Sequence, residues 1–216
     1  MDFGAALPVV VAAAAGAAAG AVLRVLLSRL RRGVALRPGA LELASALLTG
    51  LGVGLLWPGP TVALAVWAGL LAVGLGAVDV LRHRLPDALT LPAIPITALL
   101  LIGTEVAAPG TGNVLVAGVV AVVLTGLFWA VATAAPRAIG LGDVKLVPTL
   151  GLLTGYLSVA SAGVAITVAF VLGAVIALVG LATRRLTMTS AIPFGPCLLA
   201  GTWLVIAVPG IVAAVV

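Results

Sequence analysis

Long apolar runs recur along the whole length of this chain. Each spans about 17–25 residues with few charges, the length that an α-helix needs to cross the hydrocarbon core of a membrane. Of the 216 residues, 63% are hydrophobic and only 8% are charged, too few polar side chains to cover a water-facing surface. The short alternating strands of a β-barrel are not seen in the sequence. The sequence therefore predicts an all-α, polytopic membrane protein.

Breaks between the apolar runs divide the chain into about eight predicted transmembrane helices. Prolines, glycines and charged residues mark most of these breaks, and the faintest lies between the sixth and seventh helices. Nothing in the chain is polar enough for a separate soluble domain, so residues 1–216 are interpreted as one integral-membrane domain. The helices are expected at about 7–27, 41–57, 61–80, 88–103, 113–134, 144–160, 161–181 and 197–214.

The basic residues predict how the helices are oriented. All eleven Lys and Arg residues lie on one side of the predicted bundle or within about a turn of it, which makes that side cytoplasmic and places both termini outside. Asp2 precedes the first apolar run and Arg24 and Arg29 follow it, the reverse of a cleavable signal peptide. The net charge of +5 is explained by this topology, so no nucleic-acid partner is expected.

Asp79 and Asp143 are the two most informative acids on the predicted cytoplasmic side. An ionised Asp costs about 2.5–3.5 kcal/mol at the centre of a bilayer and less at its edge, so each needs a structural or functional reason. A helix N-cap would explain Asp143. Asp79 ends a helix, where its charge opposes the helix dipole, and pairing with Arg82 or Arg84 would explain it.

Two further acids have simpler interpretations. Asp87 follows Pro86 at the predicted start of a helix, where a capping role is favoured. Glu42 lies in the first turn of the second helix and either caps that helix or pairs with Arg37.

Asp79 and Asp143 share one predicted membrane depth, which suggests chemistry. Two carboxyl groups that share a site cannot both ionise easily, so the pair holds one proton. The ionised member can then take a proton from water while the protonated member polarises a peptide carbonyl, as in aspartic proteases. A thiol site built from Cys197 and His83 is a weaker alternative, because no third group is evident to orient it.

Four segments resemble motifs of the type IV prepilin peptidases, which are Gly-x-Gly-Asp membrane aspartyl proteases. Asp79 to Pro92 is similar to the first aspartate motif, and Gly140-Leu-Gly142-Asp143-Val-Lys145 to the second. Pro193-Phe-Gly195-Pro, preceded by Ile192, resembles the C-terminal signature, and the segment from Glu42 to Gly50 resembles the opening of the catalytic core. The resemblance covers about residues 41–216, after a first helix and short basic loop at 1–40.

The resemblance implies an enzyme in which Asp79 and Asp143 are catalytic. The supporting residues would be Glu42, Asp87, Gly140, Gly142, Lys145, Pro193 and Gly195. The implied substrate is a type IV pilin-like or pseudopilin precursor, cut between its short basic leader and its hydrophobic helix at the cytoplasmic face of a prokaryotic inner membrane. No metal or other cofactor is implied.

One departure from the family pattern limits the expected activity. Full-length bacterial members carry a cysteine-rich cytoplasmic insert after the first helix, associated with N-methylation, whereas this chain has only residues 28–40 there and no cysteine among them. Methyl transfer and zinc binding are therefore not expected. The main alternative function is a small transporter whose aspartates bind protons or cations, although transporters usually place such acids near the bilayer midplane.

Overall fold

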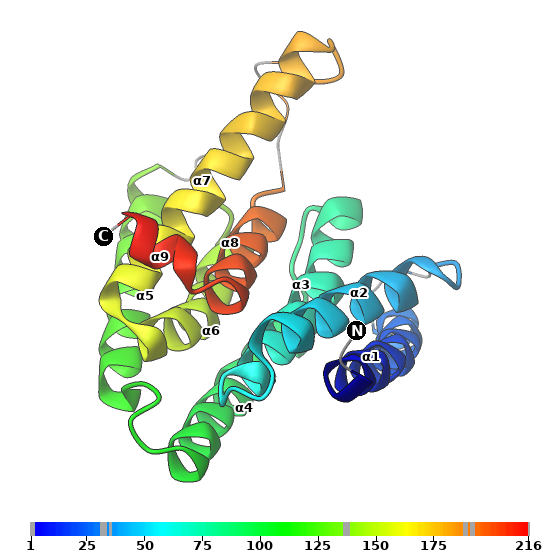
Figure 1. Cartoon of the computed structure of the whole chain (residues 1–216). Helices are drawn as coiled ribbons and strands as arrows, with labels where there is room; N and C mark the ends of the chain where they lie inside the picture. Colours follow the sequence, from blue (N-terminus) through cyan, green and yellow to red (C-terminus); the bar gives the residue numbers. More distant parts are fainter. Residues whose placement is uncertain are drawn as a thin grey trace.

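The computed structural model describes residues 3–30, 34, 36–135, 139–187, 190 and 193–215. Every regular element in these ranges is an α-helix (Figure 1). Some residues used in the sequence predictions lie outside these ranges. They are Asp2, Ile192 of the C-terminal motif, and Arg31, Arg32 and Arg137 of the basic loops. The helices are α1 Phe3–Arg29, α2 Ala40–Leu56, α3 Val62–Arg82, α4 Asp87–Ala107, α5 Val114–Ala134, α6 Leu141–Leu157, α7 Val159–Ala182, α8 Gly195–Ala207 and α9 Gly210–Val215.

Five of these helices are long and apolar enough to cross a membrane. They are α1, α3, α4, α5 and α7, while α2 and α8 are apolar but shorter. Their outer faces carry exposed aliphatic side chains, such as Val122, which is 73% exposed. The prediction of an all-α, membrane-embedded protein is therefore confirmed at this level. The eight spans and the side on which the termini lie remain predictions.

Several helix boundaries differ from the sequence prediction by about three or four residues, and one predicted helix is divided in two. The last predicted helix, 197–214, is divided into α8 and α9 before Pro209, because a proline has no N–H to continue the helix and disfavours helical backbone in the residue before it. The sixth helix begins at Leu141 rather than at 144. The structure does contain a break between the sixth and seventh helices, α6 and α7. Ser158 has an extended backbone there, and its Oγ accepts from the Ser161 N–H at 2.9 Å to cap α7.

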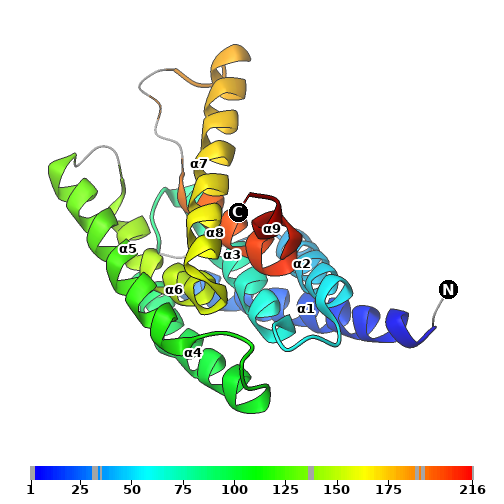
Figure 2. The same ribbon diagram turned by 60° about the vertical axis from the view of Figure 1, so that its left-hand side comes forward.

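Helix α6 lies at the centre of one half of the bundle. It contacts α4, α5, α7 and α8, and Figure 2 shows it among them. Glycines allow the close contact with α5: a Cβ on Gly151 would lie 2.6 Å from the Cα of Ala121, and one on Gly155 would lie 2.6 Å from the Cβ of Val120. Small residues at such positions let two helix backbones approach each other.

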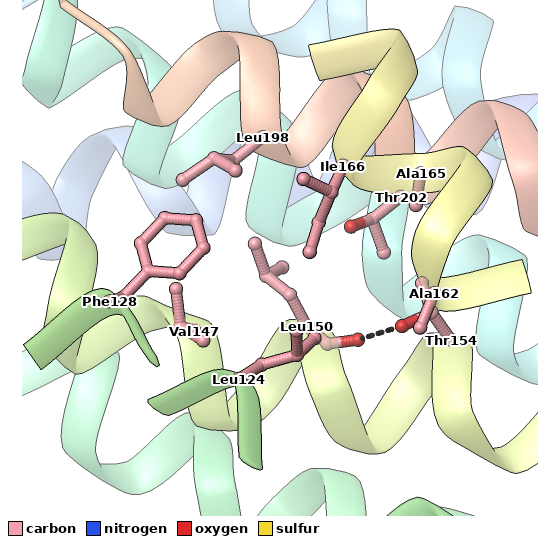
Figure 3. A pocket seen from close by; sticks show the side chains of 10 residues that line it. All are labelled: Leu124, Phe128, Val147, Leu150, Thr154, Ala162, Ala165, Ile166, Leu198 and Thr202. Carbon is pink, nitrogen blue, oxygen red and sulfur yellow. Dashed lines mark hydrogen bonds between the residues drawn. The ribbon is translucent and has the colours of Figure 1, made fainter. Parts of the chain in front are cut away.

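The side chains between α5, α6, α7 and α8 are tightly packed around Leu150 of α6. Figure 3 shows Phe128, Leu198 and Ile166 gathered there, with the Thr154 hydroxyl donating to the Leu150 carbonyl at 2.8 Å. The space left between them holds only about 10 Å³. Packing of this density fixes the position of α6, and with it the position of the charged residues in its first turn.

Candidate active site

A polar cavity of about 870 Å³ lies where α3 ends and where α4 and α6 begin. Its volume is in the range of pockets that bind small molecules or segments of peptide. The cavity brings together residues that are far apart in the sequence, including three of the predicted site acids. Its lining consists of Leu30, Asp79, His83, Arg84, Leu85, Pro86, Asp87, Ala88, Gly140, Leu141, Gly142, Asp143 and Lys145.

Asp79 reaches this cavity from the last turn of α3. The residue is only 6% exposed, and its Oδ2 accepts a hydrogen bond from the Gly195 N–H at 3.2 Å. The predicted salt bridge to Arg82 or Arg84 is wrong, since neither arginine, both in the described part of the chain, lies within ion-pair distance of Asp79. Asp79 is therefore a buried carboxylate oriented by a backbone amide rather than by Arg82 or Arg84.

Asp143 reaches the cavity from the first turn of α6. The N-cap interpretation is wrong in position, because Gly140 is the N-cap and Asp143 is the third residue of the helix. The carboxylate still lies near the N-terminal end of the helix dipole and beside the backbone N–H of Gly140. Asp143 is 8% exposed, so both aspartates are buried at the edge of the cavity.

The carboxylates of Asp79 and Asp143 lie close together. A Cβ placed on Gly195 would lie 2.7 Å from Asp79 Oδ2 and 3.4 Å from Asp143 Oδ1. Because both oxygens are that near one point, they are no more than about 6 Å apart, a distance at which like charges oppose each other's ionisation. Two helices distant in the sequence thus form one carboxyl pair.

Gly195 is the residue that makes this pair possible. It begins α8, and any side chain there would occupy the space between the two carboxylates. Phe194 precedes it and packs against Phe170 of α7 with ring centroids 5.0 Å apart, which holds this end of α8 in place. Pro193, also predicted as a supporting residue, is not among the residues that line the cavity.

The two predicted glycines of the second motif also line the cavity. A Cβ on Gly142 would lie 3.3 Å from the Cβ of Leu85, so this glycine lets the start of α6 pack against the segment between α3 and α4. A Cβ on Gly140 would lie 3.3 Å from Asp143 Oδ2. Gly140 therefore leaves the space beside the Asp143 carboxylate free of a side chain, whereas Gly142 allows close packing against Leu85.

Asp87 and Lys145 form an ion pair at the rim of the cavity. Lys145 Nζ donates to Asp87 Oδ1 at 2.8 Å and to Oδ2 at 2.9 Å, and both side chains are about half exposed. The capping interpretation of Asp87 is wrong, since the N-cap of α4 is Pro86 and no side chain caps that helix. Asp87 instead joins α4 to α6.

Glu42 lies outside the cavity. Its carboxylate accepts from the Gly39 N–H at 2.8 Å and from Arg24 Nε at 2.7 Å. The predicted capping role is confirmed, and the predicted pairing with Arg37 is replaced by pairing with Arg24. Glu42 thus fixes α2 against α1.

The cavity contains residues that sequence reasoning had not assigned to it. His83 ends α3 with a left-handed φ of 51° and lines the cavity together with Arg84. Cys197 is 2% exposed and is not part of the lining, and among the described residues no hydrogen bond joins it to His83. The chain reversal at His83 has no clear sequence signal, although the Leu85-Pro86 pair that follows it marks the end of a helix.

The chain matches no protein-family model, no curated protein and no solved structure in the comparisons made with it. Within the described part of the chain, no three His, Cys, Asp or Glu side chains form a group that could hold a metal ion.

Proposed function

We propose that this protein is a membrane aspartyl endopeptidase that removes the basic leader from type IV prepilin-like precursors. The observation that carries the proposal is the pair of buried carboxylates, Asp79 and Asp143, within about 6 Å of each other at a cavity large enough for a peptide segment. Each carboxylate belongs to one of the two motifs that resemble those of the prepilin peptidases.

The separation of the two carboxylates suits the activation of water. A water molecule can hydrogen-bond to two carboxylate oxygens that are at most about 5.5 Å apart, since each O–H···O contact is about 2.7–2.8 Å. The upper bound of about 6 Å between the Asp79 and Asp143 oxygens is compatible with such a bridge. One carboxylate takes a proton from this water, and the protonated partner donates its proton to the oxygen of the scissile carbonyl. The tetrahedral diol collapses when the carboxyl group that took the water proton gives it to the leaving nitrogen and the C–N bond breaks. A diol hydroxyl returns its proton to the other carboxylate as the carbonyl forms, so the pair again holds one proton.

The surroundings of the pair provide position and charge. The Gly195 N–H orients Asp79, and the Asp87–Lys145 ion pair holds the α4 and α6 walls of the cavity together. Asp87 is neutralised by Lys145, whereas neither Asp79 nor Asp143 has a cation within ion-pair distance among the described residues. With one proton shared between them, Asp79 and Asp143 keep about one negative charge that neither of these ion pairs neutralises.

The basic residues support a cytoplasmic location for the cavity. His83, Arg84 and Lys145 lie in its lining, and the positive-inside rule places such residues on the cytoplasmic side of a prokaryotic inner membrane. A pilin-like precursor presents its basic leader on that same side. The proposed reaction ends with cleavage and does not include methylation of the new amino terminus.

Cleavage by purified protein tests the proposal. Protein in detergent or proteoliposomes is mixed with a prepilin-like precursor, and the products are identified by mass spectrometry. We expect one cut between the leader and the hydrophobic helix, lost in Asp79→Asn and in Asp143→Asn while both variants stay folded in the membrane. Because the pair must hold one proton, the rate of the parental protein should also be bell-shaped with pH.

Two outcomes would overturn the proposal. Full cleavage by both Asn variants would remove the carboxyl pair from the mechanism. An uncut precursor, together with proton or cation flux into proteoliposomes that depends on Asp79 and Asp143, would favour the transporter alternative.

A further inference from the structure

A second hollow, the apolar groove, lies on the outside of α3 between α1 and α4. It holds about 430 Å³ and is lined almost entirely by apolar side chains. Its floor is formed by Leu71, Gly74 and Leu75 of α3, and its open edges include Val22 of α1, 58% exposed, and Ile96 of α4, 41% exposed. The groove therefore faces the region where lipid would surround the protein.

Helix packing explains why the groove exists. α4 follows α3 in the chain but packs mainly against α6, while α1 packs mainly against α2. α1 and α4 therefore leave a narrow hollow over a strip of α3, although the floor residues Leu71 and Leu75 are only 7% and 1% exposed. A strip of this kind in a membrane protein is filled either by lipid or by another helix.

The apolar groove runs directly into the polar cavity. Ala88, in the first turn of α4, lines both of them. Leu75 lies on the floor of the groove, and Asp79 follows it four residues later on the same face of α3. A chain that leaves the groove at this end therefore arrives at the carboxyl pair.

Trp67 lies at the opposite end of the groove. Trp67 Nε1 donates to Thr97 Oγ1 at 2.8 Å, which joins α3 to α4 at that point. From Trp67 to Leu75 the groove follows α3 for eight residues, about 12 Å or two helical turns. The groove is thus a short slot that opens toward the cavity.

The floor and walls of the groove suit a helix. Gly74 and Ala19 are small, and small residues at a membrane interface let a second helix backbone come close. A second helix makes more van der Waals contacts with such a surface than flexible lipid tails do, because the two helix backbones can pack closely along their length.

We propose that the apolar groove holds the first two turns of the hydrophobic helix of the substrate, with the scissile bond at the junction of the groove and the polar cavity. This inference rests on the proposed peptidase function. The groove receives the apolar segment, the cavity receives the basic leader, and the carboxyl pair lies where the two segments of the substrate meet. The position of the cut is then set by the point at which the apolar helix begins rather than by a side-chain pocket.

Filling the groove tests the proposal through the ratio of two rates. One substrate is the full precursor in membranes, and the other is a short peptide that contains the leader and the cleavage site without the helix. Gly74→Leu places a bulky side chain on the floor of the groove. We expect it to lower the rate for the full precursor relative to the short peptide by about tenfold or more.

Gly118→Leu provides the matched control. Gly118 lies in α5, away from the groove, and a Cβ there would meet no atom within 4 Å. This variant makes the same change in a helix and should keep the parental ratio. A parental ratio in Gly74→Leu, or an equal drop of the ratio in both variants, would overturn the inference.

Crosslinking tests the same contact without cleavage. In a Cys197→Ala, Asp143→Asn background, a cysteine at Ile96 should form a disulfide with a cysteine in the first turns of the substrate helix. A cysteine at Val122, on the exposed face of α5, should not. Crosslinks at Val122 but not at Ile96 would overturn the groove.

The two proposals fail in different ways. If the parental protein cuts neither substrate, the peptidase function is wrong. If it cuts both substrates but the ratio and the crosslinks do not depend on the groove, only the further inference is wrong.

Discussion

The two ends of α4 and α6 hold carboxylates in contrasting environments. At one end, the carboxylate oxygens of Glu105 accept three hydrogen bonds. The donors are the Gly110 N–H at 2.7 Å, the Tyr156 hydroxyl at 2.8 Å and the Gly112 N–H at 3.3 Å. At the other end Asp79 accepts one N–H, from Gly195 at 3.2 Å, and lies beside Asp143 in an open cavity.

The difference shows how a carboxylate's partners indicate its role. Glu105 closes the loop between α4 and α5 onto Tyr156, and its acceptor sites are used by the protein itself. Asp79 and Asp143 keep acceptor sites that water or a substrate can reach. Asp143 and Tyr156 both belong to α6 and lie about 20 Å apart. One end of α6 therefore stabilises a loop, and the other end carries a carboxylate of the proposed active site.

The largest expected effect on the cleavage rate comes from replacing one carboxylate of the Asp79–Asp143 pair by an amide, and the same replacement at Glu105 serves as its comparison. Asp143→Asn, like Asp79→Asn, should lower the cleavage rate by about 10²–10⁴-fold, since one carboxyl group can no longer exchange protons. Glu105→Gln makes the same chemical change at the other end and should leave the rate near that of the parental protein. The rates are measured with a prepilin-like precursor under saturating conditions.

Thermal unfolding provides the second half of that test. Glu105→Gln should lower the unfolding temperature, because the amide group cannot accept from all three donors. Asp143→Asn should not lower it, because it removes a charge from a crowded, buried pair. The comparison between the two ends fails if Glu105→Gln abolishes cleavage or if Asp143→Asn leaves it intact.

Gly195→Ala should have the next largest effect. The new Cβ would lie 2.7 Å from Asp79 Oδ2, so the carboxylate must move. A displacement of about 1 Å in a catalytic group can lower a rate by about 10²-fold. We expect kcat to fall while KM stays near its parental value, because the change acts on the reacting groups rather than on the groove.

Gly163→Ala is the control for this substitution. Gly163 is also in a helix, and a Cβ there would meet no atom within 4 Å. Its kcat should match that of the parental protein. Equal losses in both variants would mean that Gly195 has no specific role in positioning Asp79.

Tyr156→Phe should have a smaller effect, limited to stability. It removes one donor from Glu105 and leaves the two backbone donors in place. We expect an unfolding temperature lower by a few degrees at most and unchanged cleavage. A loss of activity without a loss of stability would show that the two ends of α6 are coupled.

The smallest expected effect concerns the ion pair at the rim of the cavity. A double-mutant cycle with Asp87→Ala and Lys145→Ala should give a coupling energy of about 0.2–1 kcal/mol, since both side chains are about half exposed. The coupling should weaken in high salt. A coupling that is large and independent of salt would mean that the pair is shielded from solvent, for example by a bound peptide.

The helices themselves were largely predictable from the sequence. Hydrophobic length is a local property, so the positions of α2, α3 and α5 were predicted within about two residues. The misplaced boundaries have local causes too: Pro209 divides the last helix, and Gly140 rather than Asp143 caps α6. A charged residue near the start of a helix can lie in its first turn or just before it, and sequence alone does not distinguish the two positions.

The partners of the charged residues were much less predictable. The sequence favoured near neighbours, Arg37 for Glu42 and Arg82 or Arg84 for Asp79, whereas Glu42 pairs with Arg24, 18 residues away. Asp87 pairs with Lys145, 58 residues away, and Asp79 accepts from Gly195, 116 residues away. Such partners depend on which helices pack together, and no local pattern encodes that choice.

The sequence by itself determined that this is an all-α membrane-embedded chain and that four acids lie at the ends of its apolar helices, because hydrophobicity and helix length are set residue by residue. Only the tertiary structure decided which of those acids are neutralised. Glycines allow α5 to approach α6, and the absence of a side chain at Gly195 lets Asp79 and Asp143 meet. Among the described residues, the packing of the helices thus leaves two of the four carboxylates without a cation at ion-pair distance, and those two define the candidate site.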